Sequence, residues 1–226
     1  MVIKRSKQLT YDEVKSNPTV ITYVRKANEN LGAIGFTEHG FRHTDLVATT
    51  ARRILLELGY STREAELAAI AGCLHDIGNL IERQHHGITG ALIAMNILKD
   101  MGMEEKEIAD VAAAIGNHDE QYGQPVSNIS AALILADKAD VHRTRVRNRD
   151  FANFDIHDRV NYAAEESDLK LDPEKRIITL ELKIDPQISR VMEYFEIFLS
   201  RMIICRRAAD VLDSRFALII NENQLL

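Results

Sequence analysis

His75 and Asp76 are adjacent in the sequence AIAGCLHDIG, at the end of an otherwise apolar stretch. Two neighbouring polar side chains at such a position must lose part of their hydration, which costs free energy unless a partner compensates for it. A bound cation is such a partner. The pair therefore indicates a candidate metal site.

Asp137 supports the same interpretation more strongly. It follows residues 131–136, a run of Ala, Leu and Ile that is apolar on every face of a helix. An ionised carboxylate in such a core needs a metal, an Arg or several hydrogen-bond donors. Further candidate ligands are His43, His86 and His118. Imidazole and carboxylate ligands without a thiolate suit Fe, Mn, Zn or Co in a reaction centre better than a structural zinc site.

The ordered set of His and Asp residues resembles the HD-domain metal-dependent phosphohydrolase superfamily, whose pattern is a His, a His-Asp pair and a distant Asp. The resemblance covers roughly residues 20 to 150. It implies four ligands for a first metal, which are His43, His75, Asp76 and Asp137. Members with two further His residues hold a second metal. That case implies a bridging Asp76, with His86 and His118 completing the second site.

The resemblance implies hydrolysis of a phosphoester or phosphoanhydride in a small, nucleotide-like substrate. One or two divalent cations would lower the pKa of a bound water and neutralise the phosphoryl oxygens during in-line attack. The candidate catalytic residues are Asp76, as the bridging ligand, and Asp119, which follows His118. Two alternatives remain open, a di-iron oxygenase on the same fold and a non-catalytic nucleotide-binding regulator.

Local motifs point to two subgroups of the superfamily. The motif HGITGA, together with His118 and LADKAD, resembles the bacterial dinucleoside tetraphosphate hydrolases. HDIG resembles the cyclic-dinucleotide phosphodiesterases and the HD nucleases. However, Asn79 stands where those phosphodiesterases commonly have Lys, and both their GYP signature and a nucleic-acid-binding companion domain are absent from the sequence. The tetraphosphate hydrolases are therefore the closer resemblance.

The one concentrated basic run, HRTRVRNR, follows the helix that is expected to carry Asp137. If that helix continues past Arg145, then Arg145 and Arg147 flank the face of Asp137 and can bind phosphate at the mouth of the site. A solvated face paired with nearby Asp residues is an equal alternative. The other candidates for phosphate binding are Lys138 and Arg42.

Helical periodicity dominates the first two thirds of the chain. The expected helices span residues 11–15, 19–30, 42–58, 61–76, 89–99 and 104–115, with a last one that starts at 128. Ser61 and Glu64 form a capping-box signature at the start of the fourth helix, and Gly78 is expected to end it. Ligands from several helix ends converge most easily in a bundle. The fold class is therefore mainly α, an HD-domain helical bundle.

The pattern changes after about residue 160. Two short strands surround an Asp-Pro-Glu-Lys turn, a long helix spans residues 187–212, and FALII has the composition of a third strand. We expect residues 1–160 to form the metal-binding domain and residues 161–226 a small β-β-α-β appendage. The appendage would serve dimerisation, giving a homodimer, or substrate closure.

The composition describes an ordinary globular chain of 226 residues with a net charge of -6. The negative charge argues against a broad electrostatic nucleic-acid binder. No apolar run approaches the length of a membrane span, and the start MVIKRSKQ lacks the apolar core of a signal peptide, so a cytoplasmic location is expected. Cys73 and Cys205 lie in apolar stretches without a spacing motif and are expected to be core residues.

Overall fold

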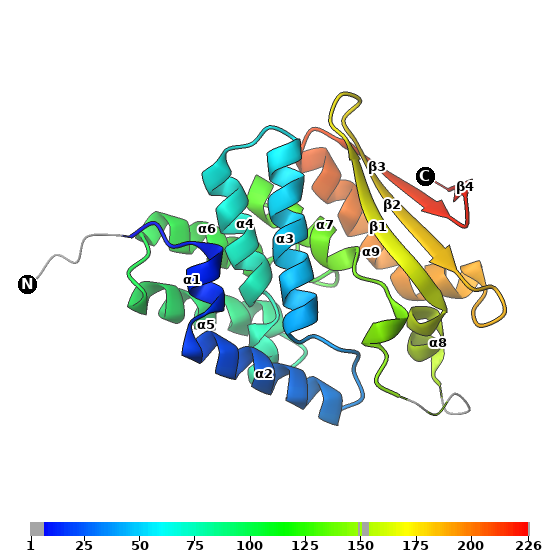
Figure 1. The fold of residues 1–226 in the computed structure, drawn as a ribbon, viewed down its shortest axis with the longest axis horizontal. Coiled ribbons are helices and arrows are strands. Elements are labelled where there is room, and N and C mark those ends of the chain that lie inside the picture. The colour runs from blue at the N-terminus through cyan, green and yellow to red at the C-terminus, as the bar shows by residue number, and fades with distance from the viewer. Residues whose placement is uncertain (1–6, 149, 151–153, 226) are drawn as a thin grey trace, which may run out of the picture.

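The computed structural model describes residues 7–148, 150 and 154–225, and this part of the chain is predominantly helical (Figure 1). Helices form a bundle in the first part, and the C-terminal residues form a small sheet with one long helix. The expected mainly α fold with a small C-terminal α+β appendage is confirmed. Within the described residues, we find no helix that is both long and apolar enough to cross a membrane.

The described chain starts with helices α1 (Tyr11–Lys15), α2 (Pro18–Ala33), α3 (Phe41–Glu57) and α4 (Thr62–Leu74). Local sequence explains the start of α4. The hydroxyl of Ser61 accepts a hydrogen bond from the backbone N–H of Glu64, and the Glu64 carboxylate accepts one from the backbone N–H of Ser61. This predicted capping box satisfies two of the N–H groups that every helix start leaves unpaired.

Helices α3 and α4 pack closely against each other at Gly72. A Cβ atom at this position would lie 2.8 Å from the backbone Cα of Ala48, which is too close for any other residue without a shift. The two helices are antiparallel neighbours joined by a short loop (Figure 1). The first turns of α3, with His43, therefore lie beside the end of α4, where His75 follows.

The bundle continues with the 3-10 turn η1 (Ile77–Leu80) and helices α5 (His86–Asp100), α6 (Glu105–Gly116) and α7 (Asn128–Lys138). Gly78 does not end α4, which stops at Leu74. It lies within η1, where a Cβ atom would meet the carbonyl oxygen of His86 at 2.0 Å. This close approach places η1 directly against the start of α5. As expected, residues 131–136 of α7 are almost completely buried.

The expectation that the helix of Asp137 continues past Arg145 is wrong. Helix α7 ends at Lys138, and η2 (Arg143–Arg145) is a separate 3-10 turn. Arg145 stabilises the break, because its Nη1 donates to the carbonyl oxygen of Asp140 at 2.6 Å and its Nε to that of Glu38 at 3.1 Å. Long-range hydrogen bonds, which a helical pattern does not reveal, thus decide the path of the chain here.

The C-terminal part consists of α8 (Ile156–Ala163), β1 (Ala164–Asp172), β2 (Ile177–Ile184), α9 (Val191–Val211), β3 (Arg215–Ile220) and β4 (Asn223–Gln224). The strand order is β1-β2-β3-β4. Strands β1 and β2 form the expected antiparallel hairpin, and β2 and β3 are parallel, so α9 is the crossover between them. Helix α8 and the short β4 were not expected. Helix α8 spans residue 160, and a domain division at this residue stays a prediction.

Helix α9 connects the appendage to the bundle, because it contacts both α7 and β3. Its buried face includes Tyr194, Phe198, Met202 and Cys205. Cys205 and Cys73 are both buried free thiols, as expected for core residues. One side of the sheet is thus covered by α9, and this helix also reaches the element that carries Asp137.

Candidate metal centre

The structure brings the six candidate metal ligands together in the interior of the bundle. They come from separate elements: His43 from α3, His75 and Asp76 from the junction of α4 and η1, His86 from the first turn of α5, His118 from just after α6, and Asp137 from α7. The four imidazoles are at most 2% exposed. No local element holds more than two of these residues, so their convergence is a result of helix packing.

One group of ligand atoms surrounds the Nε2 atoms of His43 and His75, which lie 3.2 Å apart. Asp76 Oδ2 lies 3.5 Å from the Nε2 of His43 and 3.2 Å from that of His75. Asp137 Oδ1 lies 3.4 Å and 3.6 Å from the same two nitrogens. These four side chains are those expected to bind the first metal.

A second group adjoins the first through Asp76. The Nε2 atoms of His86 and His118 lie 3.1 Å apart, and Asp76 Oδ1 lies 3.5 Å from the Nε2 of His86. The ligand atoms of Asp76, His86 and His118 all lie within 4.8 Å of one another. The two oxygens of one carboxylate therefore face two different pairs of imidazoles, which is the geometry of a bridging ligand.

The hydrogen bonds of the four imidazoles fix where their lone pairs point. Nδ1 of His75, His86 and His118 lies 2.8, 2.9 and 2.6 Å from the backbone carbonyl oxygens of Gly72, Arg83 and Ile115, in that order. Nδ1 of His43 lies 2.7 Å from Asp140 Oδ2. Carbonyl and carboxylate oxygens only accept, so each Nδ1 carries a proton and Nε2 is the ring nitrogen that faces the centre.

This arrangement needs positive charge at its centre. Facing lone pairs at hydrogen-bond distance repel unless a proton or a cation lies between them. Burial lowers the pKa of His75, but the charge of Asp76 and the hydrogen bond and charge of Asp137 outweigh burial and raise it to about 10. In addition, Asp76 Oδ2 is a buried oxygen without a hydrogen-bond partner among the described residues. The residues present therefore fit a divalent cation bound by nitrogen and oxygen.

Asp140 was missed by the sequence analysis, although it lies only three residues after Asp137. Its carboxylate accepts from His43 Nδ1 and from both terminal nitrogens of Arg42, at 3.2 and 2.7 Å. Burial raises its pKa, but the hydrogen bond from His43 and the charge of Arg145 outweigh burial and hold the pKa well below its usual range. Asp140 is thus an ionised carboxylate that orients a ligand imidazole.

A cavity adjoins the ligand atoms and receives several of the residues proposed for catalysis and substrate binding. Asp119 lines it, with Oδ2 4.0 Å from the Nε2 of His86. Lys138 and Arg145 line it as well, and the Nζ of Lys138 lies 2.7 Å from Asp137 Oδ2. Arg145 therefore reaches the cavity from the 3-10 turn η2 and not, as expected, from an extended α7.

Two of the proposed phosphate-binding residues do not line this cavity. Arg42 is held by Asp140 and Glu38. Arg147 donates to the backbone and side-chain oxygens of Asn28 and packs over Gly32 at the end of α2. The direction inferred for Arg147 depended on a continuous helix, and the break after Lys138 removes that argument.

Four further residues of the cavity were not identified from the sequence: His39, Arg83, Glu120 and Arg201. The first three lie within four residues of a candidate ligand, which is the signal that could have found them. Arg201 lies on α9, far away in the sequence, and only the packing of α9 on α7 brings it here. His39 Nδ1 lies 2.8 Å from the carbonyl oxygen of Thr37, and the ring of His39 is 5.3 Å from that of His43.

We predict that Gly72→Ala disturbs the metal centre without touching a ligand. The added methyl group would press on the backbone of α3, and we expect a loss of about 1–3 kcal/mol in the free energy of unfolding, together with reduced metal content. Gly116→Ala is the matched control, because its Cβ would only make ordinary contact with Ala91 at 3.8 Å. Denaturant unfolding and elemental analysis measure both effects. Equal stability and metal content in the two variants would refute this role for Gly72.

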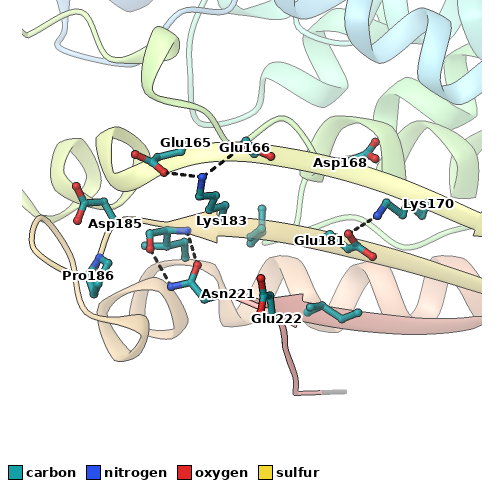
Figure 2. Close-up of a pocket in the computed structure, with 13 residues that line it drawn as sticks. Glu165, Glu166, Asp168, Lys170, Glu181, Lys183, Asp185, Pro186, Asn221 and Glu222 are labelled. Carbon is teal, nitrogen blue, oxygen red and sulfur yellow. Dashed lines mark hydrogen bonds and ion pairs between the residues drawn. The ribbon is translucent and has the colours of Figure 1, made fainter.

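A larger hollow of about 830 Å³ lies on the face of the sheet formed by β1, β2 and β3 (Figure 2). Its charged side chains pair across the strands, as Lys170 does with Glu181 and Lys183 with Glu165 and Glu166. The hollow contains none of the candidate ligands or catalytic residues. Its size therefore does not make it the reaction site.

Comparison with known proteins agrees with this geometry. Residues 40–145 match the family model of the HD domain, and this range includes all six candidate ligands. The chain is 30% identical over 163 residues to an uncharacterized protein of Methanocaldococcus jannaschii, in a match that covers 62% of this chain and 62% of the archaeal protein. The chain thus spans less than two thirds of the length of that relative.

One solved structure that matches part of the chain is that of a predicted HD superfamily hydrolase from an uncultured Thermotogales bacterium. It has a TM-score of 0.45 and 26% sequence identity, over 62% of this chain and 72% of the other. The range that matches the HD domain model, residues 40–145, is the part of the chain in which the His and Asp side chains cluster.

Proposed function

We propose that this protein is a metal-dependent phosphohydrolase that cleaves a phosphoester or phosphoanhydride in a small, nucleotide-like substrate. The observation that carries the proposal is the convergence of four imidazole lone pairs on two carboxylates, with Asp76 between the two groups. A buried centre of this kind next to a cavity lined with cations suits the binding and hydrolysis of an anionic ester.

The charges around the cavity favour a phosphate ligand. Four cationic side chains line it, Arg83, Lys138, Arg145 and Arg201, and so do four carboxylates, Asp76, Asp119, Glu120 and Asp137. Their formal charges cancel, so one or two divalent cations would leave an excess of positive charge. Such an excess would attract a phosphate group and stabilise the negative charge that develops in the transition state.

The chain's own residues have separable tasks in this proposal. When bound, divalent cations would supply an activated water and neutralise phosphoryl oxygens. Asp119 faces the cavity and can accept a proton from an attacking water molecule. Arg145, whose Nη2 has no partner among the described residues, can donate to a phosphate oxygen.

The test combines metal analysis with a hydrolysis screen. Purified protein is analysed for metals and assayed with dinucleoside polyphosphates, mononucleotides and cyclic nucleotides; the motif HGITGA ranks the dinucleoside polyphosphates first. We expect a chelator to abolish hydrolysis and an added divalent cation to restore it. Hydrolysis that persists after complete metal removal would contradict the proposal. Activity only with oxygen and a reductant would indicate an oxygenase, and binding without turnover a regulator.

A further inference from the structure

A second cleft opens from the cavity beside the metal centre. It has a volume of about 440 Å³ and lies between the segment after α2, the residues around α8, and α9. The cavity and the cleft share five lining residues, His39, Arg83, Asp119, Glu120 and Arg201. The two spaces therefore adjoin each other, and we call the second one the α2–α9 cleft.

One wall of the α2–α9 cleft presents unusually exposed apolar side chains. Ile34 is 61% exposed and Phe36 39%, and both line the cleft. The end of α2 fixes their positions, because Phe36 N–H donates to the carbonyl of Leu31 and Gly35 N–H to that of Gly32. Gly35 has a φ of +87°, as this helix ending requires. A rigid turn thus directs two large apolar side chains into open space.

The opposite wall belongs to α9 and carries Arg201. The Nε of Arg201 lies 3.0 Å from Glu120 Oε1, and its guanidinium carbon is 4.3 Å from the ring centroid of Phe198. The Nη1 and Nη2 atoms have no hydrogen-bond partner among the described residues. Glu120 is also paired with Lys138, at 2.6 Å. Arg201 is therefore held in place by one edge while its other donors face the cavity.

Arg83 connects the apolar wall to the metal centre. Its guanidinium carbon lies 5.2 Å from the ring centroid of Phe36, and its Nη1 lies 3.4 Å from the Nε2 of His86. Cations thus stand where the cavity meets the cleft, and apolar surface follows further out. Basic side chains near the metal centre and apolar side chains further out suit a ligand in which a phosphate is joined to a flat group with apolar faces. Binding pockets generally combine apolar walls with a few oriented polar groups.

We propose that the α2–α9 cleft is the subsite for the organic part of a phosphorylated substrate. Phe36 and Ile34 select a flat apolar group, and Arg201 of the C-terminal appendage binds the substrate phosphate. The inference rests on the proposed function. It assigns the appendage to the substrate site, because α9 supplies one wall and the anion-binding donor.

The experiment measures binding of non-hydrolysable probes to the metal-loaded protein by calorimetry. The probes are inorganic phosphate, methylphosphonate and phenylphosphonate. We expect phenylphosphonate to bind about tenfold more tightly than methylphosphonate, because it buries its ring against the apolar wall.

Phe36→Ala should reduce this ratio of the two phosphonate affinities to below about threefold and leave the affinity for inorganic phosphate within about twofold. Ile34→Ala tests the same wall with a more exposed residue, and Leu92→Ala is an exposed apolar control on α5.

Arg201→Gln should weaken binding of all three probes by about tenfold or more and leave the ratio between the two phosphonates unchanged. Arg201→Lys should restore part of the affinity, and Arg206→Gln on the exposed side of α9 should have no effect. Thermal unfolding of each variant shows that it is folded.

Two outcomes would overturn the subsite. One is an unchanged phosphonate ratio in both Phe36→Ala and Ile34→Ala, and the other is equal phosphate affinity in Arg201→Gln and Arg206→Gln. If hydrolysis of phosphate esters persists in those cases, the proposed function stands without this subsite. If the expected binding pattern appears but no phosphate ester is hydrolysed, the subsite is supported and the protein is a phosphate-ligand-binding protein.

Discussion

Asp76→Ala is expected to lose metal from both groups of ligands and to lose hydrolysis by a factor on the order of a thousand or more. The two oxygens of Asp76 face different imidazole pairs, with Oδ2 3.2 Å from the Nε2 of His75 and Oδ1 3.5 Å from that of His86. Removing the carboxylate therefore takes one ligand oxygen from each pair and one negative charge from the centre as a whole. Elemental analysis and the rate on the best substrate measure the result.

His118→Ala is the matched comparison, because His118 is expected to complete the second group, although its ligand atom also lies within 4.8 Å of those of His75 and Asp137. Its Nε2 lies 3.1 Å from that of His86, and its Nδ1 is held by the carbonyl of Ile115. We expect this variant to keep metal at His43, His75 and Asp137 and to lose it at the second group. Equal metal loss in the two variants would contradict a bridging Asp76. Loss of the fold is monitored separately by circular dichroism.

Asp140→Asn should weaken metal affinity by roughly ten- to a hundredfold, although Asp140 is not among the candidate ligands. Its carboxylate accepts from Nδ1 of His43 at 2.7 Å, which fixes the tautomer and the direction of the ligand nitrogen. An amide in this place would also turn its NH₂ group toward His43 or toward the guanidinium of Arg42. Competition with a chromogenic chelator measures the affinity of each variant for the metal.

Arg42→Gln distinguishes two roles of Asp140, its hydrogen bond with His43 and its ion pair with Arg42. Arg42 donates to Asp140 from a half-exposed position, so its loss should leave the bond between Asp140 and His43 in place. We expect metal affinity to change by less than about threefold, since solvent screens the half-exposed Arg42 and Arg145 Nε remains 3.5 Å from Asp140 Oδ2. If Arg42→Gln weakens metal binding as much as Asp140→Asn does, charge neutralisation and not ligand orientation is the role of Asp140.

Most local structure of the bundle could be predicted from the sequence because it depends on neighbouring residues. The start of α4 follows from the reciprocal bonds of Ser61 and Glu64, and the burial of α7 follows from its uninterrupted apolar run. The hairpin of β1 and β2 follows from alternating apolar residues and a turn. The sequence also identified the six side chains that the structure gathers, since His and Asp at the ends of apolar helices are costly without a partner.

Neighbouring residues did not determine where α7 ends or which basic side chains reach the cavity. Arg145 and Arg147 looked equivalent as members of one basic run. In the structure, Arg145 is buried against the carbonyls of Glu38 and Asp140, whereas Arg147 lies against Asn28 outside the cavity. Glu38 and Asn28 lie more than a hundred residues along the chain from the Arg that each contacts, and such contacts leave no trace in helical periodicity.

The sequence alone therefore determined which His and Asp side chains are candidates for the centre, because residue types and apolar context are local properties. The tertiary structure decided how the centre is completed: close packing at Gly72 brings His43 to His75, and the crossover helix α9 brings Arg201 to the cavity. The physical reason is that side-chain convergence depends on helix spacing and on the direction of long connections. Both are set by the packing of the whole core and not by any single segment.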